Sequence, residues 1–137
     1  MRDLSNGVRG WVLMLVALLA LPAGLAWADV GDYRVSEGGA VYLGNARLFS
    51  RPCVVSADRV YRNIAEYREI LDKGLTDKDV RYHFLMKKAS ERFLEAVKRM
   101  AKELSLDLVG EVGSIKSAKA GIAEPAEKTD DVISRLG

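Results

Sequence analysis

The sequence predicts an α+β fold, with a small strand body, an antiparallel helical hairpin and a short C-terminal helix. The main observation is an apolar stripe in residues 79–104, which recurs every three or four positions, as one face of an α-helix requires. A shorter stripe of the same period precedes it. Short apolar runs flank the two stripes and favour strands on either side of the helices.

The long helix is expected from Asp79 to Leu104, because no glycine or proline interrupts this stretch. A helix of this length extends about 40 Å, which exceeds the core of a small domain and favours packing along a second helix. Leu94 and Val97 widen its stripe. The stripe itself consists of Tyr82, Met86, Ala89, Phe93, Ala96, Met100 and Leu104.

The preceding helix is expected to start at Ser56 or Asp58, either of which can cap its N-terminus. Gly74 ends it in the left-handed conformation, and Thr76 with Asp79 resembles a capping box that opens the long helix. A connection this short predicts an antiparallel hairpin. The apolar face of this first helix is Val60, Ile64, Tyr67, Ile70 and Leu71.

Strands are expected at residues 53–56 and 106–112, before and after the helices. A short strand is expected at 33–35, and residues 40–49 predict a β-hairpin around Gly44-Asn45. Residues 114–128, rich in alanine, serine, lysine and glycine, predict a mobile loop. The last helix follows, capped by Thr129 or Asp130, with Val132, Ile133 and Leu136 as its apolar face.

Residues 1–28 have the features of a secretory signal peptide. A short basic region precedes the apolar run 11–21, and Ala26-Trp27-Ala28 forms a cleavage site. The alternative is an uncleaved membrane anchor, for which the apolar run is short. We expect an exported, soluble chain that begins at Asp29 and contains no tryptophan. Removing two of the 21 basic and one of the 19 acidic residues leaves 19 and 18, a balance that says little about partners.

Little in the sequence supports catalysis. His83 is the only histidine and Cys53 the only cysteine, so no internal disulfide, metal site or cofactor is expected. Phosphate-binding glycine motifs are absent. Cys53 lies in an apolar run and is interpreted as a buried thiol, with an intermolecular bridge or a reactive thiol as the alternatives. We therefore expect a non-enzymatic protein, and its export argues against binding nucleic acid.

The long helix is rich in cations. Residues 81–102 contain two acidic residues, Glu91 and Glu95, against seven basic ones. Such a face is either solvated and internally paired, or attracts acidic headgroups or an acidic client. The seven are Arg81, Lys87, Lys88, Arg92, Lys98, Arg99 and Lys102.

The order of elements in residues 52–137 resembles the Skp/OmpH family of periplasmic chaperones. Residues 53–60, CVVSADRV, resemble the first strand entering the first helix of that family. Residues 96–103, AVKRMAKE, followed by LDLV at 106–109, resemble the return helix and its strand. Residues 129–136, TDDVISRL, resemble the closing helix. Residues 29–51 stand outside the resemblance as an N-terminal extension.

The resemblance implies a periplasmic, ATP-independent chaperone. In that family three subunits build a body from their strands, and their helical hairpins enclose unfolded outer-membrane proteins. The hairpin helices here are short, about 25 and 40 Å. The alternative is a small exported structural or adaptor protein that uses the hairpin as a fixed protein–protein surface.

The candidate site residues follow from this hypothesis. Apolar side chains near the hairpin tip, with cations around them, would hold an unfolded client, and methionine suits changeable partners. Alternatively, Phe84 and Met86 simply close the tip. The candidate client contacts are Tyr82, Phe84, Leu85, Met86, Arg81, Lys87, Lys88 and Arg92. Phe93, Val97 and Met100 are expected to lie beyond the shorter helix and to contact other subunits of a trimer.

Overall fold

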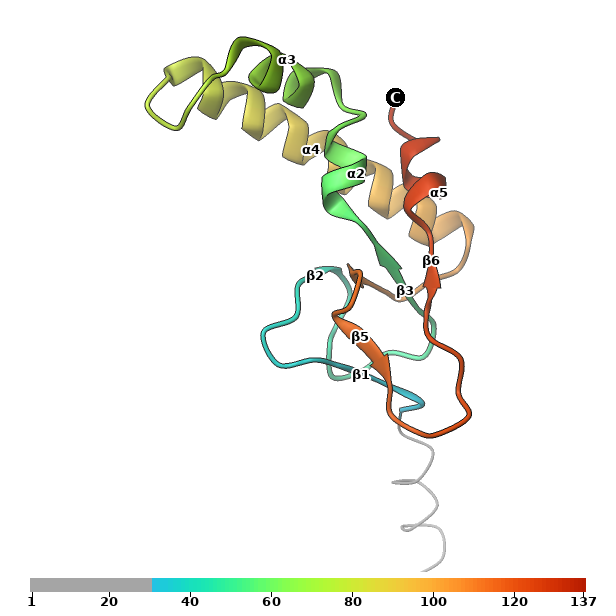
Figure 1. Ribbon diagram of the computed structural model, residues 1–137. Helices are drawn as coiled ribbons and strands as arrows, with labels where there is room; N and C mark the ends of the chain where they lie inside the picture. The colour runs from blue at the N-terminus through green and yellow to red at the C-terminus, as the bar shows by residue number, and fades with distance from the viewer. Residues whose placement is uncertain (1–30) are drawn as a thin grey trace, which may run out of the picture. The chain divides into compact units, whose positions relative to one another are not determined.

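The computed structural model describes residues 31–137, and Tyr33–Gly137 forms one compact unit (Figure 1). The expected signal peptide, its cleavage site and the first two residues of the extension lie outside the described residues. In the described part the predicted α+β class is confirmed, with four helices and two small sheets. The elements are β1 Tyr33–Val35, β2 Val41–Leu43, β3 Pro52–Val55, α2 Ala57–Tyr61, α3 Ala65–Lys73, α4 Val80–Glu103, β4 Leu108–Glu111, β5 Ile115–Ser117, β6 Ala126–Glu127 and α5 Thr129–Ile133.

A four-stranded sheet of order β2-β4-β3-β6 supports the helices. β3 runs parallel to both of its neighbours, with Cys53 opposite Val109 in β4 and opposite Ala126 in β6. β2 closes the other edge antiparallel to β4. A parallel pair needs a long crossover, and here the three helices α2, α3 and α4 make the crossover from β3 to β4. β1 and β5 form a separate antiparallel pair.

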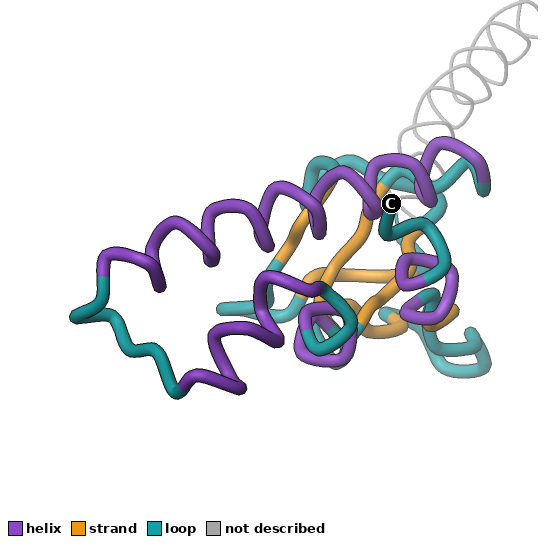
Figure 2. The backbone as a smooth tube through the Cα atoms, turned by 90° about the horizontal axis from the view of Figure 1, so that it is seen from above, coloured by secondary structure: helices purple, strands orange, loops and turns teal. Residues whose placement is uncertain are grey.

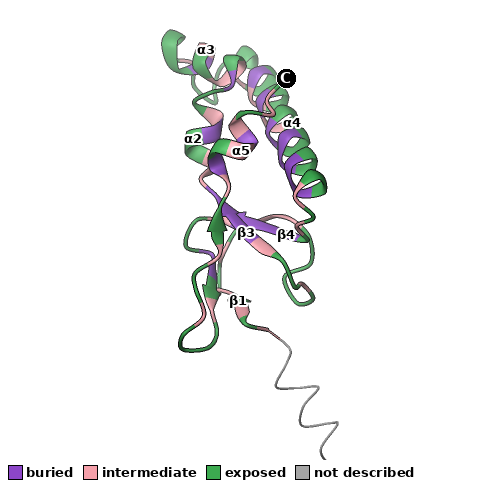
Figure 3. Cartoon of the chain, turned by 90° about the vertical axis from the view of Figure 1, so that its right-hand side faces the viewer, coloured by how far each residue is buried: buried purple, intermediate pink, exposed green. Residues whose placement is uncertain are grey.

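The core has two faces because side chains alternate along β3. Cys53 and Val55 pack in the main cluster with α4 and α5, whereas Val54 packs on the other face with Leu108 and Ile115. Figure 3 shows the buried side of α4 turned toward α2, α5 and the sheet. Phe93 is central to this cluster. Its ring centroid lies 5.1 Å from that of Tyr61 and 5.0 Å from that of Tyr42.

The predicted hairpin is formed by α3 and α4, which run side by side and meet at the turn 74–79 (Figure 2). Gly74 has the expected left-handed conformation, with φ of 60°. The Thr76 N–H donates to Asp79 Oδ2 at 2.9 Å, but Asp79 and not Thr76 occupies the N-cap position of α4, so the predicted capping box does not open this helix. The helix itself begins at Val80.

The single first helix predicted from the sequence is wrong, because the chain leaves the helical path at residues 62–64 and divides it into α2 and α3. Ile64 is extended, with φ of −95° and ψ of 127°, and is 2% exposed. The Asn63 side-chain amide donates to the Arg59 carbonyl oxygen at 2.8 Å, a local bond that competes with helical pairing. The predicted N-cap is confirmed, since Ser56 accepts from the Arg59 N–H.

The β-hairpin predicted at residues 40–49 is also wrong. β2 pairs with β4 instead, and the segment that follows makes only one isolated bridge, between Asn45 and Leu48. Gly44, with φ of 97°, crosses the backbone of Asp107 so closely that a Cβ would lie 2.1 Å from its carbonyl oxygen. Glycine, which has no Cβ, permits this close approach beside the pairing of β2 with β4. Residues 33–51 are therefore part of the compact unit.

Residues 114–128 do not form the predicted loop throughout, because β5 pairs with β1 and β6 pairs with β3. Ser114 is 8% exposed, and its carbonyl oxygen accepts from the Ser36 N–H at 2.7 Å. The expected cap of the last helix is wrong as well. Lys128 occupies the cap position of α5, and Thr129 is buried. The predicted apolar face is confirmed by Val132, which is fully buried.

Candidate functional site: the tip and base of the helical hairpin

Three large apolar side chains are exposed close to the turn between α3 and α4. Leu71 lies in the last turn of α3 and is 54% exposed, while Val80 and Phe84 on α4 are 87% and 54% exposed. Val80 and Phe84 share one face of α4, because they are four residues apart. We name Leu71, Val80 and Phe84 the tip patch.

Charged side chains brace the hairpin tip. Glu69 Oε1 accepts from Arg81 Nη2 at 2.6 Å and from Lys73 Nζ at 2.9 Å, which joins α3 to α4. These hydrogen bonds, first from Arg81 and then from Lys73, lower the pKa of Glu69. Lys88 Nζ lies 4.7 Å from the centroid of the Phe84 ring. The tip patch is therefore exposed on an organised surface.

The candidate client contacts are only partly accessible. Phe84 is exposed and Tyr82 and Met86 are half-buried, but Leu85 is 4% exposed. Leu85 is thus wrongly included, because its side chain is one of the buried residues of α4. Leu71 and Val80 were not predicted as exposed tip residues. Leu71 follows the apolar period of α3, and Val80 precedes the first residue of the long stripe.

The cations expected to surround the tip have different environments. Lys87 is exposed. Arg92 Nε pairs with Glu66 Oε1 at 3.0 Å, and the Glu66 side chain is only 15% exposed. Arg92 therefore joins the two helices of the hairpin, as Arg81 does, and contributes less to long-range attraction than a free cation would.

The residues that were expected to contact other subunits are instead buried in the core of the single chain. Phe93, Val97 and Met100 are 2%, 0% and 0% exposed within the single chain. The part of α4 that extends past α3 lies over the sheet and against α2 and α5, where Tyr42, Tyr61 and Val132 join the same cluster. These three side chains are thus unavailable to other subunits.

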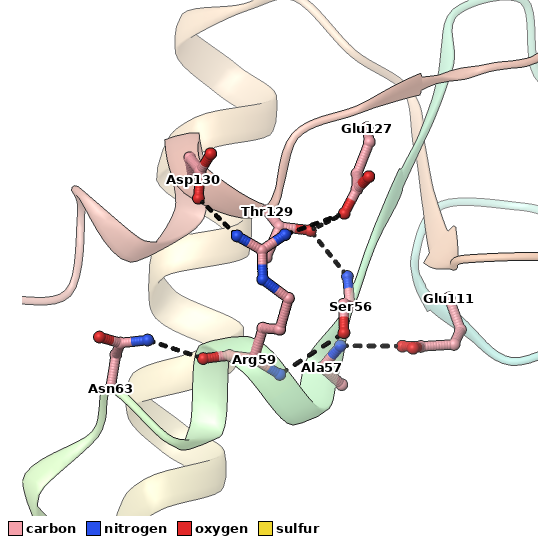
Figure 4. A network of polar contacts seen from close by, with 8 residues as sticks. All are labelled: Ser56, Ala57, Arg59, Asn63, Glu111, Glu127, Thr129 and Asp130. Atoms are coloured by element: carbon pink, nitrogen blue, oxygen red, sulfur yellow. Dashed lines mark hydrogen bonds and ion pairs between the residues drawn. The ribbon is translucent and has the colours of Figure 1, made fainter.

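A polar network holds the base of the hairpin, and Figure 4 shows its members converging on the start of α2. The Ser56 N–H donates to Thr129 Oγ1 at 2.9 Å, and the Ala57 N–H donates to Glu111 Oε2 at 3.0 Å. Arg59 bridges to α5 through Asp130 Oδ1 at 2.9 Å. Because α2 leads into α3, these contacts fix where the helices leave the sheet.

Two titratable groups near this base favour their neutral forms. Burial, followed by the hydrogen bond to Glu111, raises the pKa of Tyr42, whose hydroxyl donates to Glu111 Oε2 at 2.6 Å. Burial raises the pKa of the Cys53 thiol to about 11. Cys53 is fully buried, so the reading of a buried thiol is confirmed and nucleophilic chemistry is disfavoured.

Within residues 31–137, no three histidine, cysteine or carboxylate side chains come together as metal ligands would. No helix in the same range has the length and apolarity to cross a membrane. Comparisons with models of known families, with curated proteins and with solved structures found no match.

Proposed function

We propose that this protein is an ATP-independent chaperone-like binder of unfolded or unassembled outer-membrane and other envelope proteins. The observation that carries the proposal is the tip patch, where three large apolar side chains are exposed at the end of the hairpin. Large apolar side chains that are exposed at the end of an element are candidates for contact with another protein. The periplasmic location and the class of client come from the Skp/OmpH resemblance.

Charge supports the same proposal. Lys78 and Lys87 are exposed near the patch, and Lys88 covers one side of the Phe84 ring. Exposed cations attract acidic chains over a distance of about 8–10 Å at physiological salt. Binding should therefore weaken as salt rises, while the apolar contact remains. An acidic membrane surface would feel the same attraction.

The second candidate function is that of an adaptor with one fixed partner. The ion pairs of Arg81 with Glu69 and of Arg92 with Glu66 favour it, because they brace the hairpin as a preorganised surface. A preorganised surface selects a shape, whereas a chaperone must accept many sequences. The breadth of clients distinguishes the two functions.

Aggregation assays test the proposal. Several unrelated unfolded proteins, including an outer-membrane porin, are diluted from urea with a several-fold excess of the protein, at low and high salt. We expect light scattering to fall for most clients, and to fall less at high salt. A loss of scattering for one client only would favour the adaptor, and no effect on any client would refute the chaperone.

A further inference from the structure

Three exposed residues of α4 form a row that leads away from the turn of the hairpin. Val80 and Phe84 belong to the tip patch, and Lys88 follows four residues later. Positions four apart lie on one face of a helix, about 6 Å apart along its axis. Val80 is 87% and Phe84 54% exposed, and Lys88 is exposed as well. The row therefore presents two apolar side chains and then one cation.

Lys88 differs from its cationic neighbour on α4. Its Nζ lies 4.7 Å from the centroid of the Phe84 ring, and the attraction of the ring keeps the ammonium beside the apolar surface. Arg92, one turn further along, is paired with Glu66. Within residues 31–137 Lys88 takes part in no ion pair. Its ammonium is therefore held in position and is still able to bind a carboxylate from another chain.

The spacing of this row matches that of an extended chain. Alternate residues of a strand point to one side and lie about 6.6 Å apart, close to the step of about 6 Å between Val80, Phe84 and Lys88. An extended segment that lies along α4 can thus place one apolar side chain against Val80, the next against Phe84, and a carboxylate against Lys88.

Acidic residues at the tip favour a narrow ligand over a flat one. Asp72, Asp77 and Asp79 are all exposed, in the last turn of α3 and in the turn that follows it. An anionic bilayer pressed onto the tip would meet these carboxylates as well and would be repelled by them. One segment that lies along the row need not reach them, so its acidic group meets Lys88 alone.

We propose that Lys88 gives the tip patch a sequence preference, for extended client segments in which an acidic residue stands two positions from an apolar one. This inference rests on the proposed function, because the tip patch supplies the apolar part of the contact. It adds a short-range requirement to the long-range attraction, since the carboxylate must lie on the same side of the segment as the apolar side chains. A basic residue at that position is disfavoured, because two cations repel each other.

Two capped peptides of one composition test the preference. The peptide acetyl-Ser-Val-Ser-Phe-Ser-Asp-Ser-amide carries its carboxylate in register with the apolar residues, whereas acetyl-Ser-Val-Ser-Phe-Asp-Ser-Ser-amide carries it on the opposite side. Their net charges are equal, so long-range attraction cannot distinguish them. In nuclear magnetic resonance titrations of the full chain at low salt, we expect the in-register peptide to bind about three-fold more tightly, the size of one exposed charged contact.

Variants assign the preference to Lys88. Lys88→Gln should bind both peptides equally, and Lys88→Arg, which keeps the charge, should retain the preference. Lys98→Gln is the matched control, because Lys98 is exposed on the same helix about 15 Å from Lys88; it should behave as the wild type does. A preference that survives in Lys88→Gln, or that is lost in Lys98→Gln, overturns the proposal.

A urea-unfolded porin, titrated in the same way, separates this proposal from the proposed function. If the wild type binds the porin but binds the two peptides equally, or binds neither peptide, the preference is refuted and the chaperone-like function stands. Failure to bind the porin refutes both. Phosphatidylglycerol vesicles that bind the wild type but not Lys88→Gln would identify a lipid surface as the partner of Lys88, which also overturns the proposal.

Discussion

Asp107 fastens the segment between β2 and β3 to the start of β4. Its Oδ1 accepts from the Arg51 N–H at 2.7 Å, and its Oδ2 accepts from the Ser50 N–H at 2.7 Å. Burial alone would raise the pKa of Asp107, but the hydrogen bonds from Ser50 and Arg51 outweigh it and lower the pKa. The carboxylate therefore stabilises the fold in its charged form.

Replacing this carboxylate should give a pH-dependent loss of stability. Asp107→Asn should cost about 1 kcal/mol at neutral pH, a modest value because the side chain is exposed to solvent. The folded pKa lies below the ordinary 3.8, so the stabilisation is present above that value and is lost as the pH falls through the folded pKa. Urea unfolding of both proteins at pH 7 and pH 3 measures this. An equal difference in the free energy of unfolding between the two proteins at pH 7 and at pH 3 would contradict the role of the charge.

The burial and the conformation of a single residue were predictable where its neighbours in the sequence determine them. The burial of Cys53 follows from the apolar run around it, and the conformation of Gly74 follows from its place after a helix. Asp107 gave no such signal, because its partners lie 56 and 57 residues earlier in the chain. Glu66 gave no such signal either, since its burial depends on how α3 meets α4.

At the scale of elements, the pairing of Arg92 with Glu66 yields a second prediction. Arg92→Glu places two carboxylates together where one is largely buried, so it should lower the free energy of unfolding by about 2 kcal/mol. The matched control is Lys87→Glu, on the same helix but exposed, which should change it by less than about 0.5 kcal/mol. Urea unfolding at low salt compares the two. Equal stability of both variants would show that Arg92 does not brace the hairpin.

Long elements were predictable and short ones were not. α4 has 24 residues, so its period is visible in the sequence. The break between α2 and α3 was not visible, because Val60 and Ile64 keep helical spacing across it while the backbone does not. β6 has two exposed residues and exists only because β3 lies beside it. Tertiary pairing overrides local preference in such segments.

For the whole molecule, the sheet topology could not be read from the sequence, whereas the fold class could. The pairing of β1 with β5 joins residues about 80 positions apart; local patterns say nothing about such contacts. The tip was predicted in part: Phe84 and the cations were predicted as client contacts, whereas Leu71 was assigned to the apolar face of the first helix and Val80 to no site. Exposure at the end of a hairpin depends on which residues the opposing helix covers.

The oligomeric state stays a prediction. The resemblance predicts a trimer, although the three side chains first assigned to its contacts are buried in the chain. β2 and β6 are the edge strands of the four-stranded sheet, and edge strands are available for pairing with another chain. Light scattering at tens of micromolar should give about three times the mass of one processed chain. A monomer would refute the trimer and require each hairpin to act alone.

We propose that the tip patch binds unfolded chains, and a triple variant tests this. The test variant carries Leu71→Ser, Val80→Ser and Phe84→Ser, whose side chains are each more than half exposed and should not be needed for folding. The matched control is Leu94→Ser, also exposed on α4 but about 15 Å from Phe84 along the helix.

The most direct measurement is the affinity of each protein for a fluorescently labelled, urea-unfolded porin, followed by anisotropy at low salt. We predict that the tip variant binds at least about ten-fold more weakly than the wild type, because apolar contact is lost. Leu94→Ser should bind as the wild type does. Equal affinity of the wild type and the tip variant would contradict the account.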